Sequence, residues 1–213
     1  YIYNLKTRGL VYSFPPHADY ITTIEINSIW AVAASYDKTI SVLNLSTMQT
    51  PKRLSGHSSA VIQMRLLSNM RLLSADKEGN ILLWNLKTSK LLQRFKKLHD
   101  DVTCLSVSKD ERFLFVGTKL GYVSLYDIEN TVLLKQSYIK EETKVCSLCV
   151  LDTSNQIAVG TKSGKLNFYS LLPDQSLMLE QLKNKEYLSL YRAAEENPLL
   201  TYSPIYIKLE TLW

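Results

Sequence analysis

The stretch that decides the fold runs from Ser55 to Asn85 and reads SGHSSAVIQMRLLSNMRLLSADKEGNILLWN. It contains three short β-rich runs, at residues 60–66, 70–75 and 80–85, and a fourth follows at residues 90–95. Turn residues separate these runs, which are too short and too closely spaced for helices. The stretch therefore predicts a unit of four antiparallel strands.

The end of this unit recurs along the chain. An aromatic residue or leucine followed by a small polar residue stands at Tyr3-Asn4, Leu43-Asn44, Trp84-Asn85, Tyr126-Asp127 and Tyr169-Ser170. Successive copies are 40, 41, 42 and 43 residues apart. This period is typical of four-stranded propeller blades and is longer than that of helical repeats of about 34 residues.

Further positions keep the same register. Glycine stands five residues before the aromatic position at Gly79, Gly121 and Gly164. A small residue stands nine residues before it at Ala34, Ala75, Gly117 and Gly160. The histidines recur 26 or 27 residues before it, as His17, His57 and His99. The glycines predict tight hairpins and the small residues predict crowded strands. Because a catalytic histidine would occur once, we interpret the histidines as structural.

The stretch 55–85 resembles a WD40 repeat, with Gly56-His57 at its start and Trp84-Asn85 in place of Trp-Asp. The neighbouring units resemble the pattern less closely, because His17 and His99 lack the preceding glycine and Glu142 replaces the fourth histidine. The resemblance implies an all-β, WD40-like β-propeller in which each histidine joins a structural hydrogen-bond network.

The resemblance covers residues 1–182, which we expect to form one propeller region that begins within a blade. Residues 1–14 would supply only the last two strands of a blade. Four units follow at about residues 17–54, 57–95, 99–136 and 142–182. Since a closed ring has about four to eight blades, four and a half blades need completion. Blades before Tyr1 are the favoured explanation; another chain or strands from the C-terminal tail are the alternatives.

Residues 183–213 differ in character and are predicted to be a helical C-terminal extension. Asn184 can cap a helix over residues 184–196, with an apolar face of Tyr187, Leu190, Tyr191 and Ala194. Asn197-Pro198 would end it. Residues 199–213 fit a short helix or a strand equally well. We expect the predicted helix to dock on the propeller or on a partner protein.

Composition fits an ordinary globular protein: 213 residues are 46% hydrophobic and 21% charged. Cys104, Cys146 and Cys149 are an odd number of cysteines, which favours a reducing compartment, either cytoplasm or nucleus. The sequence contains no apolar run long enough for a transmembrane helix. We predict an intracellular protein without a transmembrane segment.

Four apparent chemical motifs coincide with repeat positions. Cys146 and Cys149 have metal-knuckle spacing but lack a second ligand pair. Residues 160–165 imitate a phosphate loop but are one residue short. His57, Ser74 and Asp76 match the structural network of the family rather than a catalytic triad. Asn44-Leu45-Ser46 is a formal glycosylation sequon at the end of a strand. The sequence therefore predicts no catalytic residue, metal or cofactor.

One surface feature remains after this comparison. Lysines stand at the predicted tips of four consecutive hairpins, at Lys38, Lys77, Lys119 and Lys162, with Lys38 shifted in register. The formal net charge is +5 and the isoelectric point is near 9.0. Such a rim would attract phosphates or carboxylates. Lysine is also common at hairpin tips simply because they are exposed to solvent. The neighbouring Asp37, Asp76 and Glu78 reduce the positive electrostatic potential of the rim.

These features predict a non-catalytic scaffold within a larger intracellular multiprotein assembly. Other protein subunits would dock on the propeller loops and the C-terminal helix. The alternative function is an RNA-associated subunit of a ribosome-assembly particle. In either case RNA or an acidic protein would bind the lysine rim. Salt dependence of RNA binding would separate the two functions.

Overall fold

The computed structural model of the chain describes residues 1–4, 6–13, 15, 17–139, 143–151, 156–171 and 177–180. All regular secondary structure among these residues is β-strand. The predicted helix at 184–196 and the segment 199–213 lie outside the described residues. The all-β expectation is confirmed for the described part of the chain.

The strands form one two-stranded sheet and four four-stranded sheets, which we number as blades 1 to 4. The N-terminal hairpin is β1 (Ile2–Tyr3) with β2 (Leu10–Tyr12). Blade 1 is β3 (Ile21–Ile26), β4 (Trp30–Ser35), β5 (Thr39–Asn44) and β6 (Lys52–Ser55). Blade 2 is β7 (Val61–Leu67), β8 (Arg71–Asp76), β9 (Ile81–Asn85) and β10 (Lys90–Arg94). Blade 3 is β11 (Val102–Val107), β12 (Phe113–Thr118), β13 (Tyr122–Asp127) and β14 (Val132–Tyr138). Blade 4 is β15 (Val145–Leu151), β16 (Gln156–Thr161), β17 (Leu166–Leu171) and β18 (Leu177–Glu180).

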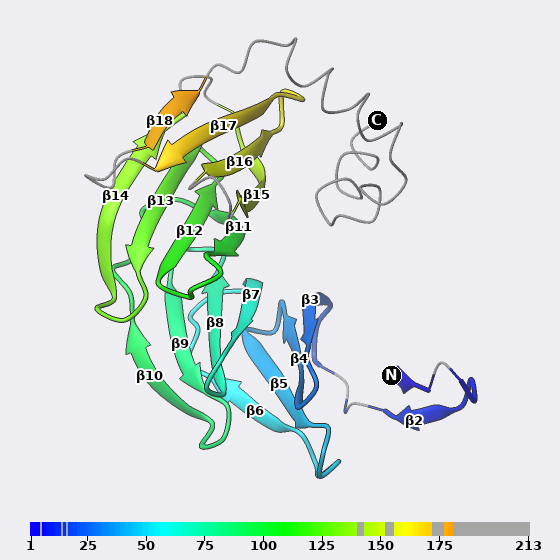
Figure 1. Ribbon diagram of the computed structural model, residues 1–213. Coiled ribbons are helices and arrows are strands. Elements are labelled where there is room, and N and C mark those ends of the chain that lie inside the picture. The colour runs from blue at the N-terminus through cyan, green and yellow to red at the C-terminus, as the bar shows by residue number, and fades with distance from the viewer. Residues whose placement is uncertain are drawn as a thin grey trace.

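Each blade is an antiparallel meander whose four strands, here called a to d, pair in chain order. The blades succeed one another along a curved arc, with strands a on the concave side and strands d on the convex side (Figure 1). β1 and β2 lie apart from this arc (Figure 1). The prediction of four consecutive four-stranded blades is confirmed.

Three apolar clusters lie between successive blades and hold the arc together. Between blades 1 and 2, Val32 and Ala34 of β4 pack with Val61 and Met64 of β7. The next two clusters repeat this arrangement, with strand a of each blade facing strands b and c of the blade before it. Each seam buries apolar surface that neither blade could bury by itself.

The seams explain why a small residue recurs on strand b. A Cβ atom placed on Gly117 of β12 would lie 2.6 Å from the Val145 Cγ1 atom of the next blade. It would lie equally close to Cys104 Sγ within its own blade. Any side chain at residue 117 would therefore push blades 3 and 4 apart.

Strand a carries a β-bulge at the same place in all four blades. In blade 3 the bulged residue is Thr103, whose hydroxyl donates a hydrogen bond to the Val145 carbonyl oxygen of blade 4 at 2.5 Å. Thr22 in blade 1 donates in the same way to the Val61 carbonyl oxygen of blade 2 at 2.6 Å. Two of the three seams are thus joined by a threonine hydroxyl as well as by apolar packing.

Removing the Thr103 hydroxyl should weaken the seam between blades 3 and 4. Thr103→Val keeps the side-chain shape but leaves the Val145 carbonyl oxygen without this donor, so the free energy of unfolding should fall by about 1 to 2 kcal/mol. Urea unfolding of Thr103→Val beside the exposed-site control Thr88→Val measures the difference. Equal midpoints for the two variants would contradict the role of this hydroxyl.

Candidate functional site

One end of the blades is formed by the b–c hairpins and by the connections that lead into strands a. We call this end the hairpin face. In every blade one hairpin amide donates to a carbonyl oxygen just before strand a, at 2.9 Å each time. These amide-to-carbonyl pairs are Tyr36 to Tyr20, Lys77 to Ala60, Lys119 to Asp101 and Lys162 to Lys144. The hairpins are therefore fixed to the blades at equivalent places.

Side chains strengthen this connection most completely in blade 2. The Trp84 indole donates to the Ser74 hydroxyl at 2.8 Å, and Ser74 lies 2.7 Å from His57 Nε2. His57 Nδ1 lies 3.1 Å from a carboxylate oxygen of Asp76. Because an ionised carboxylate only accepts, Nδ1 carries a proton, and in the neutral imidazole Nε2 accepts from Ser74. The network joins strand b, strand c and the entry to strand a through buried side chains.

Asp76 also organises the hairpin itself. Its fully buried carboxylate accepts from the backbone amides of Glu78 and Asn80 at 3.1 and 3.0 Å. Burial by itself raises the pKa of Asp76, but the hydrogen bonds from His57 and Asn80 outweigh it and lower the pKa below its usual value. Asp76 is therefore a stable acceptor, and the arrangement of Ser74, His57 and Asp76 is a structural tie.

The glycine before His57 is explained by the tryptophan. A Cβ atom on Gly56 would approach the far end of the Trp84 indole to 2.9 Å. Where the Trp84 position holds the smaller Leu43 or Tyr126, the residue before the histidine is not glycine. The Gly-His pair is thus required by the large side chain that packs beneath it.

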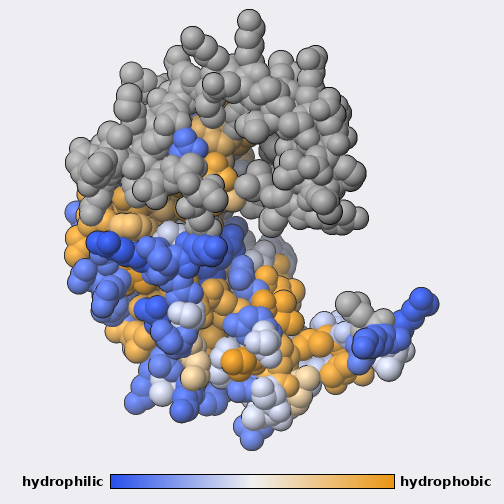
Figure 2. Space-filling view, viewed as in Figure 1, coloured by the Kyte–Doolittle hydropathy of each residue, from blue (hydrophilic) through white to orange (hydrophobic). Residues whose placement is uncertain are grey.

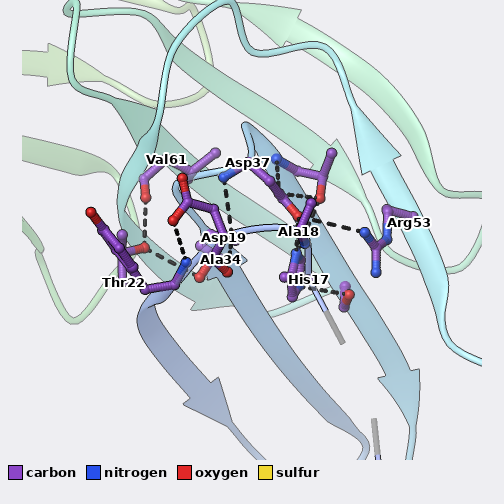
Figure 3. Close-up of polar contacts among 12 residues, drawn as sticks. His17, Ala18, Asp19, Thr22, Ala34, Asp37, Arg53 and Val61 are labelled. Atoms are coloured by element: carbon purple, nitrogen blue, oxygen red, sulfur yellow. Dashed lines mark hydrogen bonds and ion pairs between the residues drawn. The ribbon is translucent and has the colours of Figure 1, made fainter. Parts of the chain in front are cut away.

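Blade 1 makes an equivalent tie from different residues (Figure 3). His17 Nδ1 lies 2.8 Å from Asp37 Oδ2, and its Nε2 lies 2.8 Å from the hydroxyl of Ser41 on strand c. The same Asp37 oxygen accepts from the Ala18 amide at 2.9 Å and lies 3.6 Å from Arg53 Nη1. Although burial raises the pKa of Asp37, these hydrogen bonds and that of Thr39 lower it strongly.

Blade 3 does not use its histidine in this way. His99 is exposed, and the positions of Ser74 and Asp76 are held there by Val116 and Thr118. The Tyr126 hydroxyl instead donates to the Lys96 carbonyl oxygen at 2.9 Å, and burial raises the tyrosine pKa. The expectation that every repeat histidine joins such a network does not hold for His99, because the two partner positions carry no matching side chain.

Asp100, next to His99, completes the tie of blade 3. Its carboxylate accepts from the Leu120 backbone amide in the b–c hairpin at 2.8 Å. In blade 1 the accepting carboxylate, Asp37, lies on the hairpin, and the donating amide of Ala18 precedes strand a. Blade 3 has the opposite arrangement, because its carboxylate precedes strand a and its amide lies on the hairpin. Asp100 and the bulged threonines were not singled out from the sequence. The two threonines share the bulge position of strand a in the ladders. Along the sequence they stand 21 and 23 residues before Leu43 and Tyr126, so the repeat register does not align them.

The structure places the four lysines of the predicted rim on exposed parts of the hairpin face. Lys77, Lys119 and Lys162 occupy the same hairpin position, as their shared backbone bond shows. Lys38 does not, because it takes the left-handed position of Gly79, with a φ of 70° compared with 89°. Gly121 and Gly164 hold this position in blades 3 and 4. The rim therefore has three equivalent lysines and one displaced lysine.

Acidic side chains compensate part of this charge. Lys119 Nζ lies 3.5 Å from Asp101, and Glu78 pairs with Lys97 at 3.7 Å. Both pairs are solvent-exposed and contribute at most about 1 kcal/mol. The lysine of such a weak pair can release its carboxylate and bind an anionic group of a partner instead. These pairs are therefore compatible with docking.

In the part of the chain that the structure describes, the cysteines and the other possible metal ligands are not arranged as a metal site. Cys104, Cys146 and Cys149 are free thiols, and burial raises the pKa of Cys104 to about 11. No group of three potential metal ligands gathers among the described residues. No helix in that described part of the chain could cross a membrane.

Comparison with known proteins agrees with this architecture. A family model described as the anaphase-promoting complex subunit 4 WD40 domain matches residues 64–150. The WD repeat-containing protein 55 homolog of Drosophila simulans is 24% identical over 173 residues, covering 80% of this chain and 34% of the relative. The homolog of Drosophila persimilis is 27% identical over 142 residues, covering 66% of this chain and 28% of the relative. The chain spans about a third of the length of these curated relatives.

Solved structures share the fold. A structure of U3-55K superposes with a TM-score of 0.71 at 18% identity, covering 84% of this chain and 58% of that one. The computationally designed Ika4 protein superposes with a TM-score of 0.66 at 24% identity, covering 74% and 95%. Together with the repeats and the four blades, these matches show that the chain has the WD40-like β-propeller fold.

Proposed function

We propose that this chain is a non-catalytic platform of a larger intracellular multiprotein assembly, and that partners dock on its hairpin face. One observation carries the proposal: hairpins fixed at equivalent places present exposed Lys77, Lys119 and Lys162 side by side along successive blades. Loops held on a rigid scaffold are the usual binding elements of such folds. The matched family model, a WD40 domain of a complex subunit, supports membership in an assembly.

The buried polar groups of the hairpin face support a structural role. Ser74, His57 and Asp76 satisfy one another and the hairpin backbone. None of them is presented to solvent. The free cysteines support a reducing, intracellular location.

An RNA-associated subunit of a ribosome-assembly particle is the second candidate. The exposed ammonium groups favour it, because phosphate contacts by lysine dominate the affinity of proteins for nucleic acid. Asp101 and Glu78, which lie beside this rim, oppose it. The two candidates predict different partners for the same face.

Charge reversal tests both candidates. Replacing Lys38, Lys77, Lys119 and Lys162 with glutamate changes the formal net charge from +5 to −3. Each exposed substitution should change the free energy of unfolding by at most about 0.5 kcal/mol. Quantitative affinity purification should show loss of partner subunits, while fluorescence anisotropy with a single-stranded RNA should show whether RNA binding and its salt dependence fall.

The matched control reverses four exposed lysines away from the hairpin tips, Lys52, Lys87, Lys90 and Lys135. The control carries the same net charge as the hairpin variant. A loss of binding in both variants would therefore reflect net charge and not the position of the lysines. Unchanged binding of every partner and of RNA by the hairpin variant at low salt would refute docking through these lysines. A loss restricted to RNA would favour the second candidate.

Removing His57 should affect folding and leave docking chemistry intact. His57→Ala breaks a buried network, so the free energy of unfolding should fall by about 1 to 3 kcal/mol. The exposed His99→Ala should have almost no effect, and chemical denaturation compares the two. Loss of partner binding by His57→Ala at an unchanged melting temperature would instead indicate a direct role in function.

Acid should destabilise the chain through its low-pKa carboxylates. The folded state lowers the pKa values of Asp37, Asp76, Asp110 and Asp127. Their contribution is complete above the unfolded value of about 4 and is lost as the pH falls further. Urea midpoints from pH 7 to pH 3 should therefore decrease most steeply below about pH 4. In the Asp76→Asn variant the urea midpoint should decrease less steeply with falling pH. If it decreases as steeply as in the unchanged chain, Asp76 does not contribute to the acid sensitivity.

A further inference from the structure

One basic stretch of the chain lies outside the lysine rim. It reads RFKKLH over residues 94–99 and connects β10 of blade 2 to β11 of blade 3. Hydrophilic side chains predominate over β10, which leads into this stretch, whereas hydrophobic side chains gather over β3 (Figure 2). Phe95 and Leu98 are buried. The other four residues are exposed: Arg94, Lys96, Lys97 and His99. We call residues 94–99 the basic connection.

The backbone of the basic connection is held in place by both neighbouring blades. The Leu98 amide donates to the Gly79 carbonyl oxygen in the hairpin of blade 2 at 3.1 Å. From blade 3 the Tyr126 hydroxyl donates to the Lys96 carbonyl oxygen at 2.9 Å. The Phe95 ring packs edge-on against the Tyr126 ring, with the centroids 5.6 Å apart. The exposed side chains therefore project from a fixed backbone, which reduces the entropy lost when they bind a partner.

The exposed side chains of the basic connection are available to an anionic ligand. Among the described residues, the side chains of Arg94, Lys96 and His99 form no hydrogen bond or ion pair. Lys97 pairs with Glu78 at 3.7 Å, but both side chains are at least half exposed, so the pair is weak. The positive potential of this stretch adds to that of the hairpin lysines on either side of it.

Blade 3 carries a tyrosine where blade 2 carries Lys97. The amides of Leu98 and Ile139 make the same backbone bond to the hairpins of their blades, so Tyr138 stands at the place of Lys97. The Tyr138 ring lies 5.0 Å from the Tyr122 ring, at an angle of 48°. Tyr138 is 42% exposed. Two successive blades thus present basic side chains and then an aromatic surface at equivalent places.

The b–c hairpin of blade 3 holds both features. The carboxylate of Asp100, which directly follows the basic connection, accepts from the Leu120 amide at 2.8 Å. The Ile139 amide, directly after Tyr138, donates to the Gly121 carbonyl oxygen at 2.9 Å. Because Leu120 and Gly121 are neighbours in the chain, the end of the basic connection and Tyr138 are attached to adjacent residues of one hairpin.

We infer that the basic connection and Tyr138 bind single-stranded RNA. Arg94, Lys96 and Lys97 contact phosphates, and the Tyr138 ring stacks on a base. Basic side chains by themselves would suit any polyanion, but a single strand also offers base faces, which stack on exposed aromatic rings. An acidic peptide offers no such faces. This assignment rests on the RNA-associated candidate of the proposed function, and it places the ligand on residues outside the lysine rim.

The first test removes two ammonium groups by Lys96→Ala/Lys97→Ala. Fluorescence anisotropy with a labelled oligouridine of about ten nucleotides, a length within the usual range of site sizes, measures binding to the chain. The affinity at low salt should fall by about tenfold or more. The slope of log affinity against log salt should decrease by about 1.4, because each phosphate contact contributes about 0.7. The matched control, Lys87→Ala/Lys90→Ala, removes two exposed lysines at the other end of blade 2 and should leave both nearly unchanged.

The second test concerns the aromatic surface. Tyr138→Ala should lower the affinity by about fivefold or more, the loss of one stacked base, and should leave the salt slope unchanged. Tyr138→Phe keeps the ring and should bind as the unchanged chain does. Melting temperatures separate a binding defect from a folding defect. If Tyr138→Ala does not fold, Tyr138→Leu keeps the bulk of the side chain without the aromatic face and gives the same comparison.

The result that overturns this site alone is RNA binding by Lys96→Ala/Lys97→Ala and by Tyr138→Ala equal to that of the unchanged chain. If reversal of the hairpin lysines weakens binding of the same RNA, the RNA-associated candidate still stands. Absence of RNA binding by the unchanged chain at low salt overturns both. A labelled oligoglutamate provides the last comparison. If it binds as tightly as the RNA, and if Tyr138→Ala retains full RNA affinity, the basic connection is a site for acidic protein segments and the assignment to RNA is wrong.

Discussion

Each blade of this chain can bury the inner face of its strand a only when another blade lies against it. Met64 in blade 2 is fully buried because Val32 and Ala34 of blade 1 cover it, while the equivalent Ile24 of blade 1 is largely exposed. The two residues occupy the same ladder position, so their exposure differs only because another blade lies against Met64. The arc is therefore stabilised seam by seam, as in other repeat architectures.

The seams are reinforced by polar contacts that differ from one to the next. Threonine hydroxyls join blades 1 and 2 and blades 3 and 4. Blade 2 has Ile62 at this position, and the seam to blade 3 has other ties. Glu111 in blade 3 accepts from the amide and hydroxyl of Ser68 in blade 2, both at 2.6 Å. Different residues thus meet the same need, which is to join the ends of strands that no ladder hydrogen bond reaches.

On the hairpin face, too, different residues make equivalent connections in different blades. Blade 2 connects its hairpin through His57 and Asp76, whereas blade 3 uses Tyr126 and Asp100. The backbone bond into strand a remains constant at 2.9 Å throughout. A face of fixed hairpins with variable side chains is suited to recognition of partners, since the tips can change without disturbing the blades.

The sequence by itself determined the blades. A period of 40 to 43 residues records how much chain one blade uses, and strand order and turn positions follow from local residues such as Gly79 and Asn85. It also indicated the network of His57 and Trp84, because both lie within one repeat. Tertiary structure alone decided that Thr22 and Thr103 bridge blades and that His99 is exposed. These outcomes depend on contacts between strands about 40 residues apart and on whether a partner side chain is within reach. A repeat pattern records spacing along the chain, but burial and hydrogen bonding depend on what packs across the seam.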